Sequence, residues 1–168
     1  EESPAESASR RLAKVDVAMF PEAAEFVRGD LERDEIYYTN SIHLRPDVPV
    51  DLVRRIEMQA KFHPMIESGA IIHAFVGEQR PVPDSIMSLV EKTYRNTQAA
   101  QLAVSPEFTL CEACHRSERG LRETCSHCDS PSVYGVTRIV GYYSRVNNWN
   151  PSKLAELRDR RRGNYAIR

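Results

Sequence analysis

The sequence contains 168 residues, of which 41% are hydrophobic and 28% are charged, and its formal net charge is −1. This composition is typical of a globular domain with a hydrophobic core, and the near-neutral charge gives no overall attraction to nucleic acid or to an anionic membrane. Because no apolar run approaches the roughly 20 residues that span a bilayer and no segment resembles a signal peptide, we expect a cytoplasmic protein without membrane or nucleic-acid partners.

The first part of the chain predicts two helices followed by a strand. Apolar residues recur at helical spacing over residues 7–20, and Pro21 favours a second short helix that ends near residue 28. A run of β-forming residues, ended by prolines, predicts a strand over residues 37–44. The side chains expected on one face of this strand are those of Tyr38, Asn40, Ile42 and Leu44.

The next segment continues the alternation of helix and strand. Asp51 is expected to cap a helix that Pro64 ends, and Asp84 is expected to cap a longer helix. Between them, a near-continuous apolar run over residues 71–76 predicts a strand covered on both faces. This alternation favours an α/β fold. The apolar stripes of the two helices consist of Leu52, Val53, Ile56 and Ala60, and of Ile86, Leu89, Val90, Tyr94 and Thr97.

The last third of the chain differs from the rest in composition and in the length of its segments. Short segments broken by cysteines and glycines between residues 108 and 140 are typical of a module whose fold depends on a metal ion rather than on a hydrophobic core. β-forming residues return over 133–140. A final helix is expected from an N-cap at Asn150 to about Arg162, where Gly163 can end it.

Two Cys-x-x-Cys motifs, separated by ten residues, contain all four cysteines of the chain. Each motif lets two thiolates point at one ion, and two motifs complete the tetrahedron that Zn²⁺ prefers. Because four thiolates leave no open coordination position, the zinc should be structural rather than catalytic. The expected ligands are Cys111, Cys114, Cys125 and Cys128.

Some alternatives stay open at this site. Iron is chemically possible with four thiolates, and paired cysteines can also serve redox or disulfide chemistry. His115 and His127 adjoin the motifs and could replace a ligand, although a solvated or supporting role is the simpler interpretation.

Gly141 follows an apolar strand and precedes two tyrosines. Considered locally, it is most simply explained by a turn or bulge that needs a positive φ or a close backbone approach. Its position relative to the cysteine motifs suggests a second interpretation, because the segment from Arg138 to Tyr143 lies directly after them.

This arrangement resembles the C-terminus of class III, anaerobic ribonucleoside-triphosphate reductases, which are glycyl radical enzymes. In that family a zinc ribbon precedes an Arg-x-x-Gly-Tyr segment, and the glycine stores the radical. The likeness extends in collinear order over nearly the whole chain. The other segments that resemble the family are residues 4–7, 11–16, 37–44, 69–75, 106–107 and 148–156.

The resemblance implies a division of the chain into three parts. Residues 1–107 would form the C-terminal part of a ten-stranded β/α barrel, and residues 108–131 would form the zinc ribbon. Residues 132–168 would contain the glycyl radical loop and a C-terminal helix.

The resemblance also implies a chemistry. An activase that uses S-adenosylmethionine and an iron–sulfur cluster would generate the radical on Gly141. The radical would pass to a cysteine thiol, and the thiyl radical would attack the ribose 3′ C–H of a ribonucleoside triphosphate, so that deoxyribonucleotides are made for DNA synthesis. Glycine suits this role because a Cα without a side chain can form a planar, delocalised radical.

The sequence differs from that of a complete reductase in its cysteines. All four cysteines belong to the ribbon, so none remains to form the thiyl radical. We therefore expect a fragment or split-gene product that works with a larger reductase polypeptide containing that cysteine. The resemblance also implies that the complete enzyme is a homodimer. The first residue, Glu1 rather than methionine, agrees with this expectation.

Other polar residues have local explanations. Glu6 lies in a segment that resembles a substrate-cavity loop and is a candidate nucleotide contact, although a charged residue at a helix start is the simpler interpretation. His43 and His73 are expected to be core histidines, and the basic run over 158–162 a solvated helix face. Two other functions stay open: a stand-alone spare part that supplies a glycyl radical, and a zinc-ribbon module that binds nucleic acid or protein.

Overall fold

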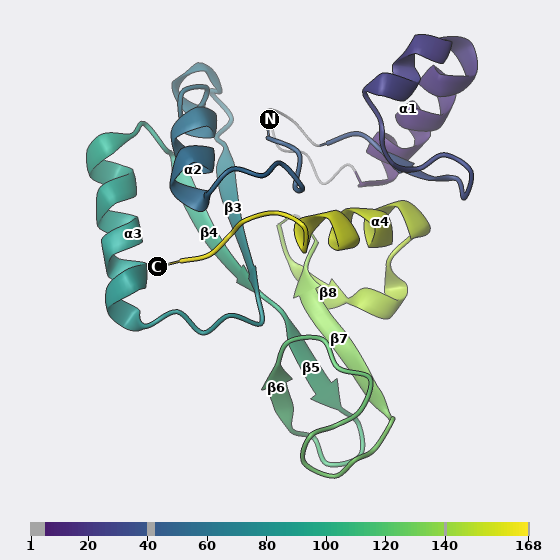
Figure 1. Ribbon diagram of the computed structural model, residues 1–168, viewed down its shortest axis with the longest axis vertical. Coiled ribbons are helices and arrows are strands. Elements are labelled where there is room, and N and C mark those ends of the chain that lie inside the picture. The colour runs from purple at the N-terminus through teal and green to yellow at the C-terminus, as the bar shows by residue number, and fades with distance from the viewer. Residues whose placement is uncertain (1–5, 40–42, 140, 168) are drawn as a thin grey trace.

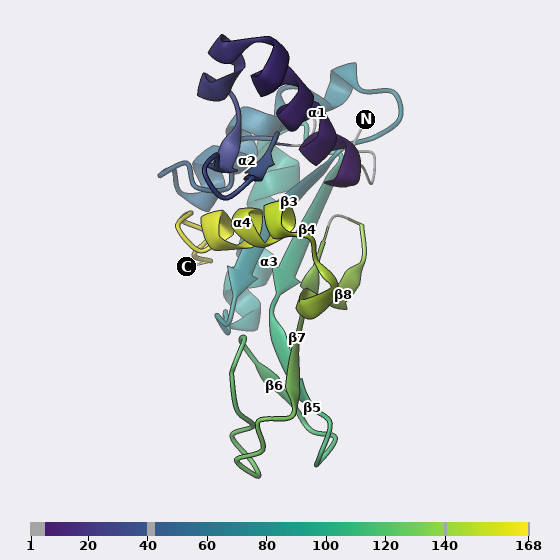
Figure 2. The ribbon, with the colours of Figure 1, turned by 90° about the vertical axis from the view of Figure 1, so that its right-hand side faces the viewer.

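The computed structural model describes the chain except residues 1–5, 40–42, 140 and 168 and the side chains of residues 6 and 7. Figure 1 shows a body of helices around a pair of strands, with a narrow β-rich arm projecting from one end, and the side view of Figure 2 shows the same arm. Within the described residues, no helix is long and apolar enough to cross a membrane.

The helices are α1 (Glu6–Met19), α2 (Leu52–Ala60), α3 (Pro83–Asn96) and α4 (Pro151–Arg160), with 3-10 turns at Pro21–Glu25, His63–Met65 and Val146–Asn148. The strands are β1 (Arg28–Asp30), β2 (Glu35–Tyr37), β3 (Ile71–Gly77), β4 (Gln101–Pro106), β5 (Phe108–Cys111), β6 (Ser117–Arg119), β7 (Val133–Arg138) and β8 (Tyr143–Arg145).

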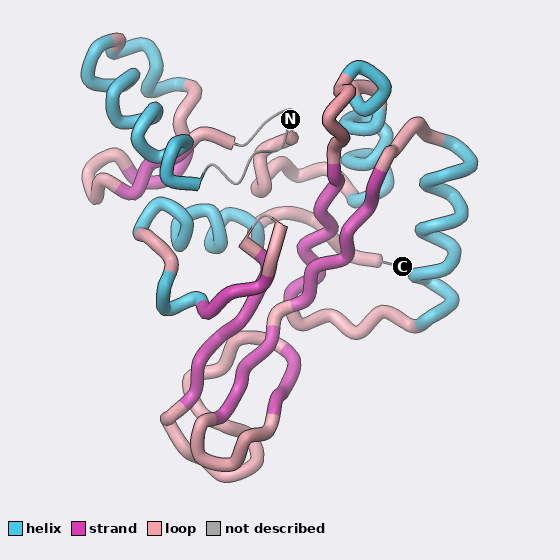
Figure 3. Tube along the Cα trace, turned by 180° about the vertical axis from the view of Figure 1, so that it is seen from behind, coloured by secondary structure: helices cyan, strands magenta, loops and turns pink. Residues whose placement is uncertain are grey.

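The main hydrophobic core lies around β3, which pairs in parallel with β4. Figure 3 shows these two strands side by side, with α3 beside them. Ile72 and Ala74 of β3 are fully buried, and Leu52 and Ile56 of α2 belong to the same cluster. The strand predicted over residues 71–76 is therefore confirmed. Strand β4 was not predicted, because its short run mixes apolar and polar residues and ends in a proline.

The strand predicted over residues 37–44 is wrong in its extent. β2 ends at Tyr37, which pairs with Arg28 of β1. Residues 38–39 and 43–44 are not in a strand, and residues 40–42 lie outside the described part of the chain. Because β1 has only three residues, no described strand offers backbone partners to the residues after Tyr37. Strand propensity without a neighbouring strand does not produce a sheet.

Two of the three predicted helix N-caps are present in the structure. Asp51 accepts a hydrogen bond from the Arg54 N–H (2.8 Å), and Asn150 accepts one from the Lys153 N–H (3.0 Å), so both predicted N-caps are confirmed. The predicted cap at Asp84 is wrong. Helix α3 begins at Pro83, which places Asp84 inside the first turn. There its negative charge interacts favourably with the positive end of the helix dipole.

The apolar stripe of α1 does not coincide with its buried face. Leu12 and Met19 of α1 are 56% and 64% exposed, whereas Ala13 is fully buried. In α2 the predicted stripe is mostly confirmed, because three of its four residues are buried and only Val53 is exposed. Helical spacing thus identifies the buried side of α2 but not that of α1.

The arm is a four-stranded antiparallel sheet in the order β6-β5-β7-β8. Strand β7 confirms the predicted return of β structure and leads from the arm back to the body. Because the sheet joins β5 to β7, it connects residues on both sides of the predicted boundary between 131 and 132. The fold is α/β, as predicted, and the division into three parts and the barrel remain predictions.

Candidate functional site

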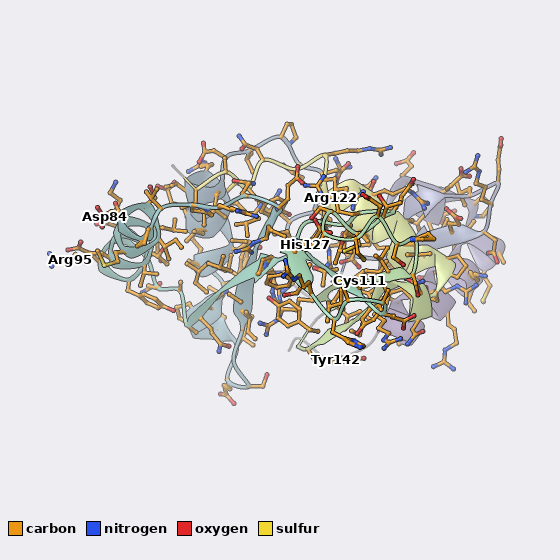
Figure 4. The ribbon with its side chains drawn as sticks, turned by 90° about the horizontal axis from the view of Figure 1, so that it is seen from below. Asp84, Arg95, Cys111, Arg122, His127 and Tyr142 are labelled. Carbon is orange, nitrogen blue, oxygen red and sulfur yellow. The ribbon has the colours of Figure 1, made fainter. Side chains whose placement is uncertain are left out.

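The loops of the arm bring the four cysteines together. Their four Sγ atoms all lie within 4.8 Å of one another, and Figure 4 views the molecule from this end, with Cys111 labelled. The Sγ–Sγ distances are 3.7 Å for Cys111 and Cys128 and 3.6 Å for Cys114 and Cys125. A tetrahedral zinc site with Zn–S bonds of about 2.3 Å requires sulfur separations of about 3.8 Å. The four thiols therefore fit one four-coordinate metal ion.

Both cysteine loops have the same backbone geometry. The residue after each motif has a positive φ, 58° at His115 and 55° at Asp129. Its N–H donates to the carbonyl of the first cysteine of the motif, over 3.0 Å in each case. In the first loop the Cys114 N–H also points at the Cys111 Sγ (3.5 Å), and this contact, together with the Ala113 N–H and the neighbouring thiols, lowers the pKa of Cys111 to about 7. The backbone thus favours the thiolate form of Cys111, whereas burial and the neighbouring thiols raise the pKa of Cys114 and that of Cys128.

The two neighbouring histidines do not join the sulfur cluster. Among the described residues, the potential metal ligands grouped here are the four cysteines alone. His115 and His127 are both exposed, and His127 Nδ1 lies 3.2 Å from the Arg116 guanidinium. This placement supports the interpretation of both histidines as residues that surround the site.

A hairpin between β7 and β8 has Gly141 near its tip. Arg138 pairs with Tyr143 at the end of the two strands, and the Ile139 N–H donates to the Tyr142 carbonyl over 2.9 Å. Gly141 and Tyr142 are both exposed, and Figure 4 labels Tyr142 at the edge of the molecule in that view. The hairpin therefore presents the backbone of Gly141 at the surface formed by the described residues.

The described structure gives no steric reason for a glycine at position 141. A Cβ built on Gly141 meets no described atom within 4 Å, and Gly141 is not among the described glycines with a positive φ. Gly163 behaves differently, because a Cβ there would lie 2.1 Å from the Pro46 carbonyl oxygen. The glycine at the hairpin tip is therefore not explained by a tight turn or by a close approach of neighbouring residues.

Helix α4 lies beside the loop end of this hairpin and contacts it through Arg160. The Arg160 side chain is 3% exposed, and its guanidinium donates to the carbonyl of Arg138 (2.7 Å) and to that of Ile139 (2.8 Å). Two further N–H groups donate to one oxygen of Glu156, at 2.6 and 3.1 Å. The hairpin is thereby joined to a buried charged group on α4.

The other residues named from the sequence lie in different surroundings. Glu6 is the first residue of α1, and its side chain lies outside the described part of the chain. His73 is buried and stacks on Phe75 at 5.4 Å between ring centroids. His43 Nδ1 lies 3.2 Å from the Gln59 side-chain oxygen. Both histidines border a cavity of about 40 Å³, which agrees with their interpretation as core residues.

A family model described as anaerobic ribonucleoside-triphosphate reductase matches residues 1–162. The chain belongs to this family. The match spans the cysteine arm, the hairpin with Gly141 and all of α4, and it confirms the resemblance found in the sequence. A search of curated proteins finds no match.

Solved structures of anaerobic ribonucleotide reductases share the fold. One of them superposes with a TM-score of 0.71 at 24% identity, covering 95% of this chain and 24% of that chain. A structure of the Thermotoga maritima enzyme with MES in the active site gives a TM-score of 0.66 at 25% identity, covering 89% of this chain and 23% of that chain. Another, in complex with dATP and CTP, gives 0.63 at 23% identity, covering 96% and 23%. The chain thus spans about a quarter of the length of these reductases.

The buried position of Arg160 in this reductase-family chain differs from the expectation for the basic run over residues 158–162. The side chains of Arg158, Arg161 and Arg162 are 50%, 54% and 72% exposed, as a solvated helix face requires, but Arg160 is buried. The spacing of four residues between Glu156 and Arg160 is a sequence signal for an ion pair on one helix face. That signal predicts the pair but not its burial.

Proposed function

We propose that this chain is the radical-bearing C-terminal portion of an anaerobic ribonucleotide reductase, an oxidoreductase that reduces ribonucleoside triphosphates to deoxyribonucleotides for DNA synthesis. The main support is the family match over residues 1–162, a range that includes the four-cysteine arm and the Gly141 hairpin. The proposed partners are the reductase polypeptide that contains the thiyl cysteine, the S-adenosylmethionine-dependent activase and the nucleotide. The complete enzyme would be a homodimer.

The four cysteines would hold a structural Zn²⁺. At one end of β7, Val133 pairs with Cys111, which is one of the ligands. At the other end, Arg138 pairs with Tyr143 at the base of the Gly141 loop. Because one strand joins the two sites, an ion that orders the cysteine loops would also order the sheet from which the hairpin extends. Its role would be mechanical, since four thiolates leave no position for a substrate.

Gly141 would store the radical after the activase removes one hydrogen atom from its Cα. The Gly141 radical would then take a hydrogen atom from the cysteine thiol, and the thiyl radical would abstract the ribose 3′ hydrogen. The open space around Gly141 supports this role, because the hydrogen-abstracting group and the thiol must both reach the Cα. Shielding of the radical from water and oxygen would be supplied by other parts of the reductase.

A reconstituted reductase assay tests this function. The protein that contains this chain is activated anaerobically with the activase, S-adenosylmethionine and a reductant, and deoxyribonucleotide formation is measured. Wild type should be active, Gly141→Ala should be inactive, and the neighbouring Tyr142→Phe should remain active because it keeps the glycine backbone. Inactive wild type, or an active Gly141→Ala protein, would reject the proposal.

A further inference from the structure

Arg160 uses both the edge and the face of its guanidinium. Its N–H groups donate to the carbonyls of Arg138 and Ile139, which lie three and two residues before Gly141, and to Glu156. The guanidinium carbon lies 4.0 Å from the centre of the Phe75 ring, a distance typical of a cation–π contact. Arg160 therefore fixes the base of the hairpin to both α4 and β3.

The partners of Arg160 are themselves fixed. The second oxygen of Glu156 accepts a hydrogen bond from the Lys153 ammonium over 2.7 Å, and the Lys153 side chain is only 4% exposed. Burial alone raises the pKa of Glu156, but Arg160 and Lys153 more than offset this effect and hold the pKa below its usual value. Glu156 is therefore charged at neutral pH and holds Arg160 by charge-assisted hydrogen bonds.

From this geometry we propose that Arg160 is a positioning residue that sets the location of the Gly141 Cα for hydrogen transfer. The proposal rests on the function proposed above. A planar fork is needed, because two neighbouring carbonyls and a carboxylate are bound at once. A lysine has the same charge but presents it as a single point, so it cannot bind all three groups in one plane.

The test compares Arg160→Gln and Arg160→Lys with Arg158→Gln in the activated enzyme. Arg158 lies on the same helix, is half exposed and pairs with Glu35, so it controls for loss of a positive charge from α4. Four quantities are measured: zinc content, radicals per chain, turnover per radical at saturating nucleotide, and KM. Hydrogen exchange of the hairpin amides in the zinc-loaded protein gives a readout that does not depend on activity.

Both Arg160 variants should keep their zinc and their KM but lose turnover per radical by about 10- to 100-fold, since small misplacements of reacting atoms have effects of that size. Their hairpin amides should exchange about tenfold faster or more, and Arg158→Gln should match wild type in every readout. If Arg160→Gln does not fold, Glu156→Gln keeps the arginine and should show the same losses to a smaller degree.

Unchanged turnover per radical in an Arg160 variant, or full rescue by lysine, would overturn the positioning role. A parallel fall in zinc, radical content and thermal stability with normal turnover per radical would also overturn it, because that pattern indicates support of the fold alone. A wild-type enzyme that forms no glycyl radical would instead reject the proposed function, so the two failures are distinguishable.

Discussion

Two glycines of this chain should respond very differently to the addition of one methyl group. A Cβ on Gly163 would lie 2.1 Å from the Pro46 carbonyl oxygen and 2.5 Å from Cε2 of Tyr165. That carbonyl cannot retreat freely, because it accepts hydrogen bonds from the Tyr165 hydroxyl (3.1 Å) and from the guanidinium of the buried Arg55 (3.3 Å). We therefore expect Gly163→Ala to require movement of the buried segment around Pro46.

The expected losses follow from these distances. Overpacking together with a weakened buried hydrogen bond gives a cost of about 3 kcal/mol for Gly163→Ala. In a protein of this size, that cost lowers Tm by roughly 6–12 °C. Gly141→Ala meets no described atom within 4 Å, so its free energy of unfolding should change by less than about 1 kcal/mol.

Thermal unfolding followed by far-ultraviolet circular dichroism measures both changes, with the two variants and wild type loaded with equal zinc. A Gly163→Ala protein that unfolds at the wild-type temperature would refute the predicted clash with the Pro46 carbonyl. A loss of stability in Gly141→Ala as large as that in Gly163→Ala would refute the predicted difference between the two positions, since it would mean that the glycine at position 141 serves the fold.

Three further predictions concern the metal, pH and oxygen. Cys125→Ser should lower zinc content and abolish radical formation while leaving the far-ultraviolet helix signal largely intact, and full activation of a metal-free variant would contradict this. Because Arg160 and Lys153 outweigh the effect of burial and hold the pKa of Glu156 low, its carboxylate stabilises the fold above the unfolded-state pKa of about 4.3 and loses this effect as pH falls through the lower folded-state value. Glu156→Gln should thus cost about 2 kcal/mol at neutral pH and little in strong acid, as unfolding curves over a pH series can measure. Air exposure of the activated enzyme should cleave the chain at Gly141, and mass spectrometry showing an activated but uncut chain would count against the radical site.

The features that could be predicted from the sequence depend on residues close together in the chain. Asp51 and Asn150 cap helices through N–H groups three residues away, so their roles are visible locally. The cysteine spacing likewise brings ligands together through short loops, and the four Sγ atoms lie as close as one ion requires.

The features that could not be predicted depend on partners far along the chain. The strand expected over residues 37–44 stops at Tyr37, because its partner Arg28 is the first residue of β1 and propensity does not reveal the limits of a partner strand. Arg160 is buried because carbonyls of the β7–β8 hairpin and the Phe75 ring of β3 surround it. Neither group is near Arg160 in sequence, so the basic run alone indicates only a solvated face.

Electron paramagnetic resonance of the anaerobically activated enzyme tests the central claim most directly. A radical on the Cα of Gly141 retains one α-hydrogen, so the account predicts a doublet signal that collapses to a single line when the protein is made with α-deuterated glycine. The signal should be absent from Gly141→Ala. A signal that is insensitive to glycine labelling, or one that persists in Gly141→Ala, would contradict the account.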